Sequence, residues 1–345
     1  MSYKKLVFSL FLTLSILITV NMCMAVEDTW TKEADMPNTR FLHRICAVDG
    51  KIYVVGGLEN WQNPQSFIDE YDPKTNNWTR KIELILIRGF FGISVLNGKI
   101  YIMGGSNMSA LPMANVEEYD PKTNTLQKKA DMPTARIVLS ASAVNGKIYA
   151  IGGAKGFNAP LSVTEEYDPA TDKWTKKANM SAARGEFSTA VVDGIIYAIG
   201  GSEDGSVEAY DPVTDTWSRK SKMPTPMWGN ACSAVNNIIY VISGTIYLRH
   251  DGMTLVEAYD PATNTWIKKA DIPTPRTQFN TCDIDGKIYA IGGNKSFIEA
   301  FGANSPMVTS IEVYDTGFLP AEGNTTAVSF KTKLINTWGQ MKLCK

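Results

Sequence analysis

Gly50-Lys51-Ile52-Tyr53-Val54-Val55-Gly56-Gly57 is the stretch that decides the fold, because close relatives of it return along the whole chain. Six copies share an apolar strand with a tyrosine and a terminal glycine pair or a variant of it; their final glycines are Gly57, Gly105, Gly153, Gly201, Gly244 and Gly293. Successive glycines lie 48, 48, 48, 43 and 49 residues apart. A period of this length indicates an array or a propeller rather than an ordinary domain.

Each period also predicts four short antiparallel strands. Asp-Gly or Asn-Gly precedes most copies of the stretch, and this dipeptide is the strongest short-range signal for a β-hairpin. A Tyr-Asp-Pro turn follows in most periods, for example at Tyr119, and predicts a second hairpin. The outer strand of that hairpin begins at a large apolar residue; this column holds Trp78, Leu126, Trp174, Trp217 and Trp266.

The glycine pair that ends the second strand, the tyrosine before it and the tryptophan that opens the fourth strand resemble the Kelch repeat. The resemblance covers residues 28–315 and implies an all-β, six-bladed β-propeller with four-stranded antiparallel blades. Six Tyr-Asp strands are followed by only five outer strands, whereas Trp30 begins an outer strand that lacks a blade. We therefore expect residues 28–33 to complete the last blade beside residues 310–315, which removes the open sheet edges.

The two ends of the chain fall outside this pattern. Residues 1–25 combine Lys4 and Lys5 with an apolar run and small residues ending at Ala25, which predicts a signal peptide and a periplasmic or extracellular protein. A membrane anchor is the alternative, but the apolar run is shorter than the ~20 residues that span a bilayer. Cys23 leaves acylation open as a further alternative. Residues 26–315 are expected to form the propeller and residues 316–345 a tail outside it.

Charge and cysteine content exclude some classes of partner and scaffold. The formal net charge is −1, and it becomes −3 without Lys4 and Lys5. Acidic and basic residues are interspersed, so we expect a monomer that binds neither nucleic acid nor, after signal removal, a membrane. Five cysteines in this chain do not form the pattern of a disulfide framework. Cys46, Cys232 and Cys282 fall in innermost strands, where we expect them to pack as small apolar residues.

A repeat array separates structural columns from site residues, since a residue needed in every blade solves a problem that every blade has. An acidic residue lies two positions before each Tyr-Asp tyrosine, and a basic column enters the inner strands: Arg40, Arg88, Arg136, Arg184 and Arg276. An anion-binding ring is one interpretation of this pattern. The repetition favours the other interpretation, in which each arginine pairs with an acidic residue inside its blade.

Symmetry is broken in the segments that follow each glycine pair, and chain direction places these segments at one mouth of the ring together with the entries to the inner strands. Aromatic and charged residues on such segments are typical of binding surfaces. The predicted ligand-binding residues are Trp61, Phe157, Trp228, Tyr247, Arg249, His250, Phe297 and Phe301. Blade five departs most, with Met227 in place of arginine and Ser243 in place of glycine, so a pocket is expected beside it. The alternative is that these aromatic residues only cover blade edges.

No arrangement in the sequence points to catalysis. His43 and His250 are the two histidines, neither has a second ligand at metal spacing, and no nucleophile elbow or helical zinc motif occurs. We expect no metal and no cofactor. The sequence therefore predicts an exported binding module for a protein or glycan partner. Exported six-bladed Kelch proteins also include sialic acid mutarotases, which act on a free acidic sugar at the channel mouth. The catalytic residues of those enzymes have no match in this chain, and Arg249, His250 and Glu299 are our candidates if it shares that activity.

Overall fold

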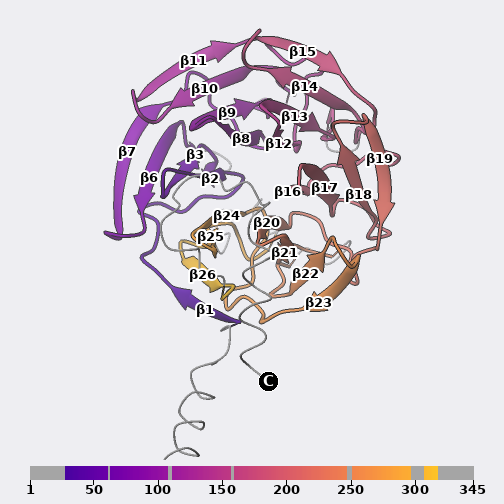
Figure 1. Ribbon diagram of the computed structural model, residues 1–345. Helices are drawn as coiled ribbons and strands as arrows, with labels where there is room; N and C mark the ends of the chain where they lie inside the picture. The colour runs from indigo at the N-terminus through magenta and orange to yellow at the C-terminus, as the bar shows by residue number, and fades with distance from the viewer. Residues whose placement is uncertain are drawn as a thin grey trace, which may run out of the picture.

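The computed structural model describes residues 28–60, 63–107, 111–156, 159–246, 251–296 and 307–317. These residues form six four-stranded antiparallel sheets arranged as blades around a central axis, as the Kelch resemblance implied (Figure 1). Within the described residues, the structure contains no helix with the length and apolar character needed to cross a membrane. The predicted signal peptide and nearly all of the predicted tail lie outside the described residues.

The strands of the first three blades follow the chain from the axis to the rim. Blade one contains β2 (Arg44–Val48), β3 (Lys51–Val55), β6 (Phe67–Asp72) and β7 (Asn77–Glu83). Blade two contains β8 (Gly92–Leu96), β9 (Lys99–Met103), β10 (Val116–Asp120) and β11 (Thr125–Lys129). Blade three contains β12 (Ser140–Val144), β13 (Lys147–Ile151), β14 (Thr164–Asp168) and β15 (Lys173–Lys176).

The remaining blades repeat this order, and the last one uses both ends of the chain. Blade four contains β16 (Ser188–Val192), β17 (Ile195–Ile199), β18 (Val207–Asp211) and β19 (Thr216–Lys220). Blade five contains β20 (Ala231–Val235), β21 (Ile238–Ile242), β22 (Val256–Asp260) and β23 (Thr265–Lys268). Blade six contains β24 (Asn280–Ile284), β25 (Lys287–Ile291), β26 (Ile311–Asp315) and β1 (Thr29–Lys32). A small hairpin follows β3 and consists of β4 (Leu58–Asn60) and β5 (Asn63–Pro64).

The inner hairpins turn where the sequence predicts. Asp49 and Gly50 both have positive φ, at 50° and 75°, and Asn145 and Gly146 repeat this geometry at 51° and 75°. Two consecutive positive φ angles define the type I′ turn, whose twist matches that of the flanking strands. In blade five Asn236 and Asn237 take the same conformation without a glycine.

The ring closes through the predicted pairing of the two chain ends. Trp30 lies opposite Tyr314, and in Figure 1 the indigo strand β1 runs beside the yellow strand β26. The Tyr314 hydroxyl donates to the Asp28 carboxylate, which reproduces the bond from Tyr119 to Asn124 within a continuous blade. The Trp30 indole NH donates to the Ala270 carbonyl of blade five at 3.0 Å. The closing blade is therefore held by the same contacts as the others.

The hydrophobic core is divided among the seams between neighbouring blades. One cluster joins blades one and two around Val55 and Ile100, and an equivalent cluster joins blades six and one around Ile291 and Ile52. Burial of these side chains is the main favourable term in folding. Because the last seam has a cluster like the rest, the ring has no open interface at which to separate.

The repeated arginines are structural, as the sequence interpretation favoured. Arg88, Arg136, Arg184 and Arg276 are fully buried, and each pairs with the acidic residue of its own blade, Glu117, Glu165, Glu208 or Glu312, at 2.5–2.8 Å. Arg40 pairs in the same way with Asp69. Each guanidinium of the four also donates to backbone carbonyls, as Arg136 does to Gly152 at 3.0 Å. These pairs fix the inner strand to the third strand.

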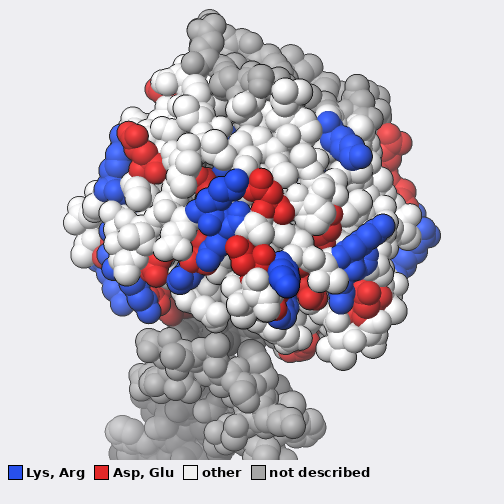
Figure 2. All heavy atoms as spheres, turned by 90° about the horizontal axis from the view of Figure 1, so that it is seen from above, with Lys and Arg blue, Asp and Glu red and all other residues white. Residues whose placement is uncertain are grey.

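The outer rim carries mixed charge. Figure 2 shows the molecule edge-on, and on this face basic and acidic side chains lie side by side. Elsewhere along the rim, as well as here, oppositely charged side chains three residues apart pair, for example Lys128 with Asp131 at 3.6 Å and Lys268 with Asp271 at 3.5 Å. Exposed pairs of this kind contribute at most ~1 kcal/mol each to stability.

Candidate functional site: the central channel

One end of the ring gathers the variable segments, as chain direction predicted. In five of the six blades the residue after the glycine pair forms a bridge with the residue entering the inner strand. These bridges are Phe41 with Leu58, Gly89 with Ser106, Ile137 with Ala154, Trp228 with Thr245, and Thr277 with Asn294. We call this end the loop face. The opposite end, where the inner hairpins turn, is the turn face.

Of the eight predicted binding residues, the structure describes Trp228 alone. It is half-buried on the loop face, and its backbone exchanges two hydrogen bonds of 2.9 Å with Thr245. The other seven, Trp61, Phe157, Tyr247, Arg249, His250, Phe297 and Phe301, lie outside the described residues, as does Glu299. Their role in binding stays a prediction.

A ring of six residues with left-handed backbone narrows the channel on the loop face. Each occupies the second position after the arginine column or its equivalent, and their φ angles are 48–59°: Leu42, Phe90, Val138, Glu186, Gly229 and Gln278. We call them the mouth ring. Positive φ is costly for residues other than glycine, and most costly for a β-branched residue such as Val138. Such strain persists only where the surrounding structure imposes it.

Backbone hydrogen bonds between neighbouring blades impose that conformation. The Val138 amide donates to Phe90 at 2.7 Å, Glu186 to Val138 at 3.3 Å, and Gly229 to Glu186 at 2.8 Å. Gln278 donates to Gly229 at 3.3 Å, and Leu42 to Gln278 at 3.1 Å. The mouth ring therefore ties successive blades together around the axis.

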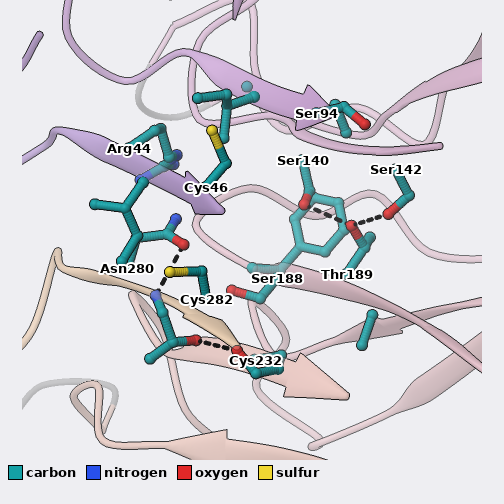
Figure 3. A pocket seen from close by; sticks show the side chains of 18 of the residues that line it. Arg44, Cys46, Ser94, Ser140, Ser142, Ser188, Thr189, Cys232, Asn280 and Cys282 are labelled. Carbon is teal, nitrogen blue, oxygen red and sulfur yellow. Dashed lines mark hydrogen bonds between the residues drawn. The ribbon is translucent and has the colours of Figure 1, made fainter. Parts of the chain in front are cut away.

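Below the mouth ring, a cavity of about 560 Å³ lies on the axis of the propeller. All six inner strands line it, so it lies on the axis and is not confined to the neighbourhood of blade five, where a pocket was expected. Figure 3 shows its wall, with Arg44 and Asn280 on the neighbouring strands β2 and β24. The volume lies within the range of small-molecule sites, roughly 300–1,000 Å³.

Most polar groups of the cavity wall satisfy one another. The Thr189 hydroxyl bonds with Ser140 at 2.8 Å and with Ser142 at 2.7 Å, which Figure 3 shows as dashed lines. Ser188 donates to the Asn230 carbonyl at 2.7 Å, and Ser233 bonds to Thr281 at 2.9 Å. These hydroxyls therefore form a structural lining.

Three of the described residues that line the cavity are charged: Arg44, Glu186 and Asp283. Burial lowers the pKa of Arg44 to about 10, and the Glu186 carboxylate opposes that shift. Burial raises the pKa of Glu186, which the nearby charge of Arg44 partly offsets. The Asp283 side chain is exposed, but it faces a channel that protein surrounds on all sides, and the resulting desolvation raises its pKa to about 6. At neutral pH the cavity thus holds a cation and at least one anion.

The sequence reasoning missed these three residues, although each is the one charged residue in its column of the repeat. Where Arg44 opens its inner strand, the other blades have Gly92, Ser140, Ser188, Ala231 and Asn280. Where Asp283 stands, the other blades have Ala47, Val95, Ala143, Val191 and Ala234. Comparing inner-strand columns would have identified both. Glu186 is likewise the one charged residue in its column, where the other blades have Leu42, Phe90, Val138, Gly229 and Gln278.

Blade five lacks the arginine of the repeated pair. Met227 is buried in its place, and the Glu257 side chain, 5% exposed, keeps a bond of 3.2 Å from Thr225. Burial raises the pKa of Glu257. The Ser243 hydroxyl lies within hydrogen-bond distance of the Met253 and Arg276 carbonyls. This blade departs from the repeat inside its core as well as on the loop face.

The described histidine and cysteines belong to the packing. His43 is fully buried against the Ile291 carbonyl at 3.1 Å, and burial lowers its pKa to about 3, so it is neutral at ordinary pH. Cys46, Cys232 and Cys282 are free thiols in the inner strands, and burial raises the pKa of each. The described parts of the chain contain no cluster of three or more His, Cys, Asp or Glu suited to a metal ion.

Comparison with known proteins agrees with this architecture. The family described as the KLHDC2/KLHL20/DRC7 Kelch-repeats domain matches residues 88–244, and the family described as the Kelch motif matches residues 39–81 and 229–273. No curated protein sequence matches the chain. A solved structure described as "Structure of YjhT" is similar with a TM-score of 0.69 at 15% identity, covering 81% of this chain and 95% of that chain. At this identity the likeness is one of fold alone.

Proposed function

Because this chain belongs to the Kelch-repeat β-propellers, we propose that it is an exported binding module that recognises a protein or glycan partner through its loop face. Export rests on residues 1–25 of the sequence, which have the features of a signal peptide. A propeller of this kind is a rigid support, and its function lies in the segments that it carries.

The observation that carries the proposal is the gathering of all the variable segments at one end of a closed ring. Bridges such as Phe41 with Leu58 and Trp228 with Thr245 fix the bases of five of the six segments to the inner strands. The segments can therefore differ in sequence without disturbing the blades. Half-buried Trp228 provides one aromatic anchor on this face.

The positions of the two ends of the propeller domain also favour the loop face as the binding surface. Asp315 pairs with Thr29 and with Lys287, the first residue after an inner turn, and Thr316 donates to the Gly286 carbonyl at 2.5 Å. Both ends of the propeller domain therefore lie on the turn face. A partner on the loop face would meet neither of them.

The test is a pull-down and a glycan array with the full chain lacking its signal peptide. Replacing Tyr247, Arg249 and His250 together by Ala, with Trp228→Ala as a second variant, is expected to abolish capture while thermal unfolding stays unchanged. The matched control replaces Val213, Arg219 and Ile267 by Ala on the exposed rim and is expected to retain capture. Unchanged capture by both loop-face variants would contradict the proposal.

The second candidate is a sugar-processing enzyme of the sialic acid mutarotase type. The charged channel favours it, because Arg44 suits the carboxylate of a free acidic sugar and Glu186 and Asp283 are acids of raised pKa. Proton NMR of freshly dissolved N-acetylneuraminate, with and without the protein, measures the rate at which its anomers equilibrate. A rate equal to that of buffer would exclude this candidate.

A further inference from the structure

The axial cavity differs from the loop face in what it can recognise. Leu42, Phe90 and Val138 are at most 6% exposed and belong to one packed apolar cluster, so the mouth ring restricts access from the loop face. Towards the turn face the cavity extends to Ala143, Val191 and Asp283. A small molecule would enter from the turn face, where the protein partner of the loop face would not block it.

Arg44 is an enclosed cation whose charge no direct ion pair balances. Its Nε donates to the Phe91 carbonyl at 2.9 Å and its Nη1 lies 3.4 Å from the His43 carbonyl. Among the described residues no carboxylate lies within 4.0 Å of it, and no bond from its Nη2 is found, whereas Arg136 meets Glu165 at 2.5 Å. The Arg44 guanidinium thus faces the cavity with N–H groups that have no hydrogen-bond partner among the described residues.

Glu186 lies on the opposite side of the ring, three blades away. The two groups influence each other's pKa, yet their charged atoms are more than 4.0 Å apart, since no ion pair joins these two described residues. Asp283 adds a second carboxyl group further towards the turn face. The cavity therefore holds Glu186 across the axis from Arg44, and Asp283 on the blade next to Arg44 but nearer the turn face.

We propose that the cavity is a binding site for a small zwitterion with a carboxylate and an ammonium group, of the class of free amino acids. The carboxylate would accept hydrogen bonds from the Arg44 guanidinium, whose fork geometry fits a carboxylate. The ammonium group would lie towards Glu186 and favour the charged form of that side chain. Wall hydroxyls such as Ser140 and Thr189 already bond to each other, so the charges carry the recognition.

The charge pattern argues against the simpler ligands. A simple carboxylate would satisfy Arg44 but would approach two acidic groups, and a simple amine would meet the cation without compensation. A neutral sugar would leave both charges unpaired in a poorly solvated cavity. Only opposite charges within one molecule match both sides of the channel.

Isothermal titration calorimetry on the full chain lacking its signal peptide tests this inference. The probes are L-alanine, 4-aminobutyrate, propionate, propylamine and N-acetylneuraminate. At least one zwitterion is expected to bind at least about tenfold more tightly than propionate or propylamine. Arg44→Met and Glu186→Gln are each expected to weaken that binding by about tenfold or more, and the rim variant Arg219→Met is expected to leave it unchanged.

Arg44→Lys keeps the positive charge but lacks the paired N–H donors of the guanidinium. It provides a second variant if Arg44→Met does not fold. The inference would be overturned if neither L-alanine nor 4-aminobutyrate bound, or if propionate bound as tightly as they do. It would also be overturned if N-acetylneuraminate bound more tightly than either, or if Arg44→Met left their binding unchanged. Capture of a partner by the loop face is expected to survive Arg44→Met, so failure here is distinguishable from failure of the proposed function.

Discussion

Arg136 and Arg44 stand only four positions apart in the repeat, since Arg136 is aligned with Arg40, yet they occupy different kinds of region. Arg136 stands inside a blade, where a fully buried guanidinium meets Glu165 and three carbonyl oxygens. Arg44 stands on the channel wall, where it contacts two carbonyls and, within the described part of the chain, no carboxylate. The first arrangement recurs in other blades and the second does not. A recurring charge therefore stabilises the blade, whereas a unique charge on the wall is free to meet a ligand.

Breaking a repeated pair is expected to have the largest effect. Arg136→Met leaves Glu165 buried without its cation, which costs about 3–5 kcal/mol of unfolding free energy. Urea denaturation followed by tryptophan fluorescence measures the loss. The double variant with Glu165→Leu is expected to recover part of it, because no uncompensated charge then remains. A single variant within about 1 kcal/mol of the wild type would show that the column is not structural.

Blades four and five sharpen the comparison, because the same substitution is expected to act in opposite directions. Glu208→Gln removes the charge that faces Arg184 at 2.8 Å and is expected to cost about 2 kcal/mol. Glu257 has Met227 where the other blades have arginine, so ionising it is unfavourable, and Glu257→Gln is expected to stabilise by up to about 1 kcal/mol at pH 7. Equal losses in the two variants would contradict this difference between the blades.

Asp283 allows a test of the channel wall by pH. Its pKa is raised from 3.8 to about 6 in the folded chain, so the folded state holds the proton more tightly than the unfolded state. Wild-type stability relative to Asp283→Asn should therefore be highest below pH 3.8 and should fall as the pH rises through 6. Arg44, Glu186 and the thiols of Cys46, Cys232 and Cys282 line the same cavity and remain in both proteins. Denaturation at pH 4.5 to 8 measures the difference, and one that does not vary with pH would contradict the poor solvation of Asp283.

The fold could be predicted from the sequence because the same pattern of strands and turns occurs in six successive periods. Trp30 without a blade and Tyr314 without an outer strand already required their pairing, and the structure pairs them. Even Leu126 takes the predicted place of tryptophan opposite Tyr119. Local turn signals and the period determine the first five blades, and only the closing blade requires a long-range pairing.

The channel could be predicted only in part. Arg44 and Asp283 stand out when the six inner strands are aligned, but the predicted binding residues came from the variable segments and not from these strands. Glu186 is also the one charged residue in its column, but only the structure shows that the left-handed backbone of this column lies at the axis. Pocket formation depends on how six blades meet, and no single repeat contains that information.

The unfolding free energy of Arg44→Met, measured beside that of Arg136→Met without added ligand, tests the central distinction most directly. If the channel charges are free for a ligand and not part of the scaffold, Arg44→Met should stay within about 1 kcal/mol of the wild type, while Arg136→Met loses about 3–5 kcal/mol. A loss of similar size in both variants would contradict the account, since Arg44 would then be one more structural arginine.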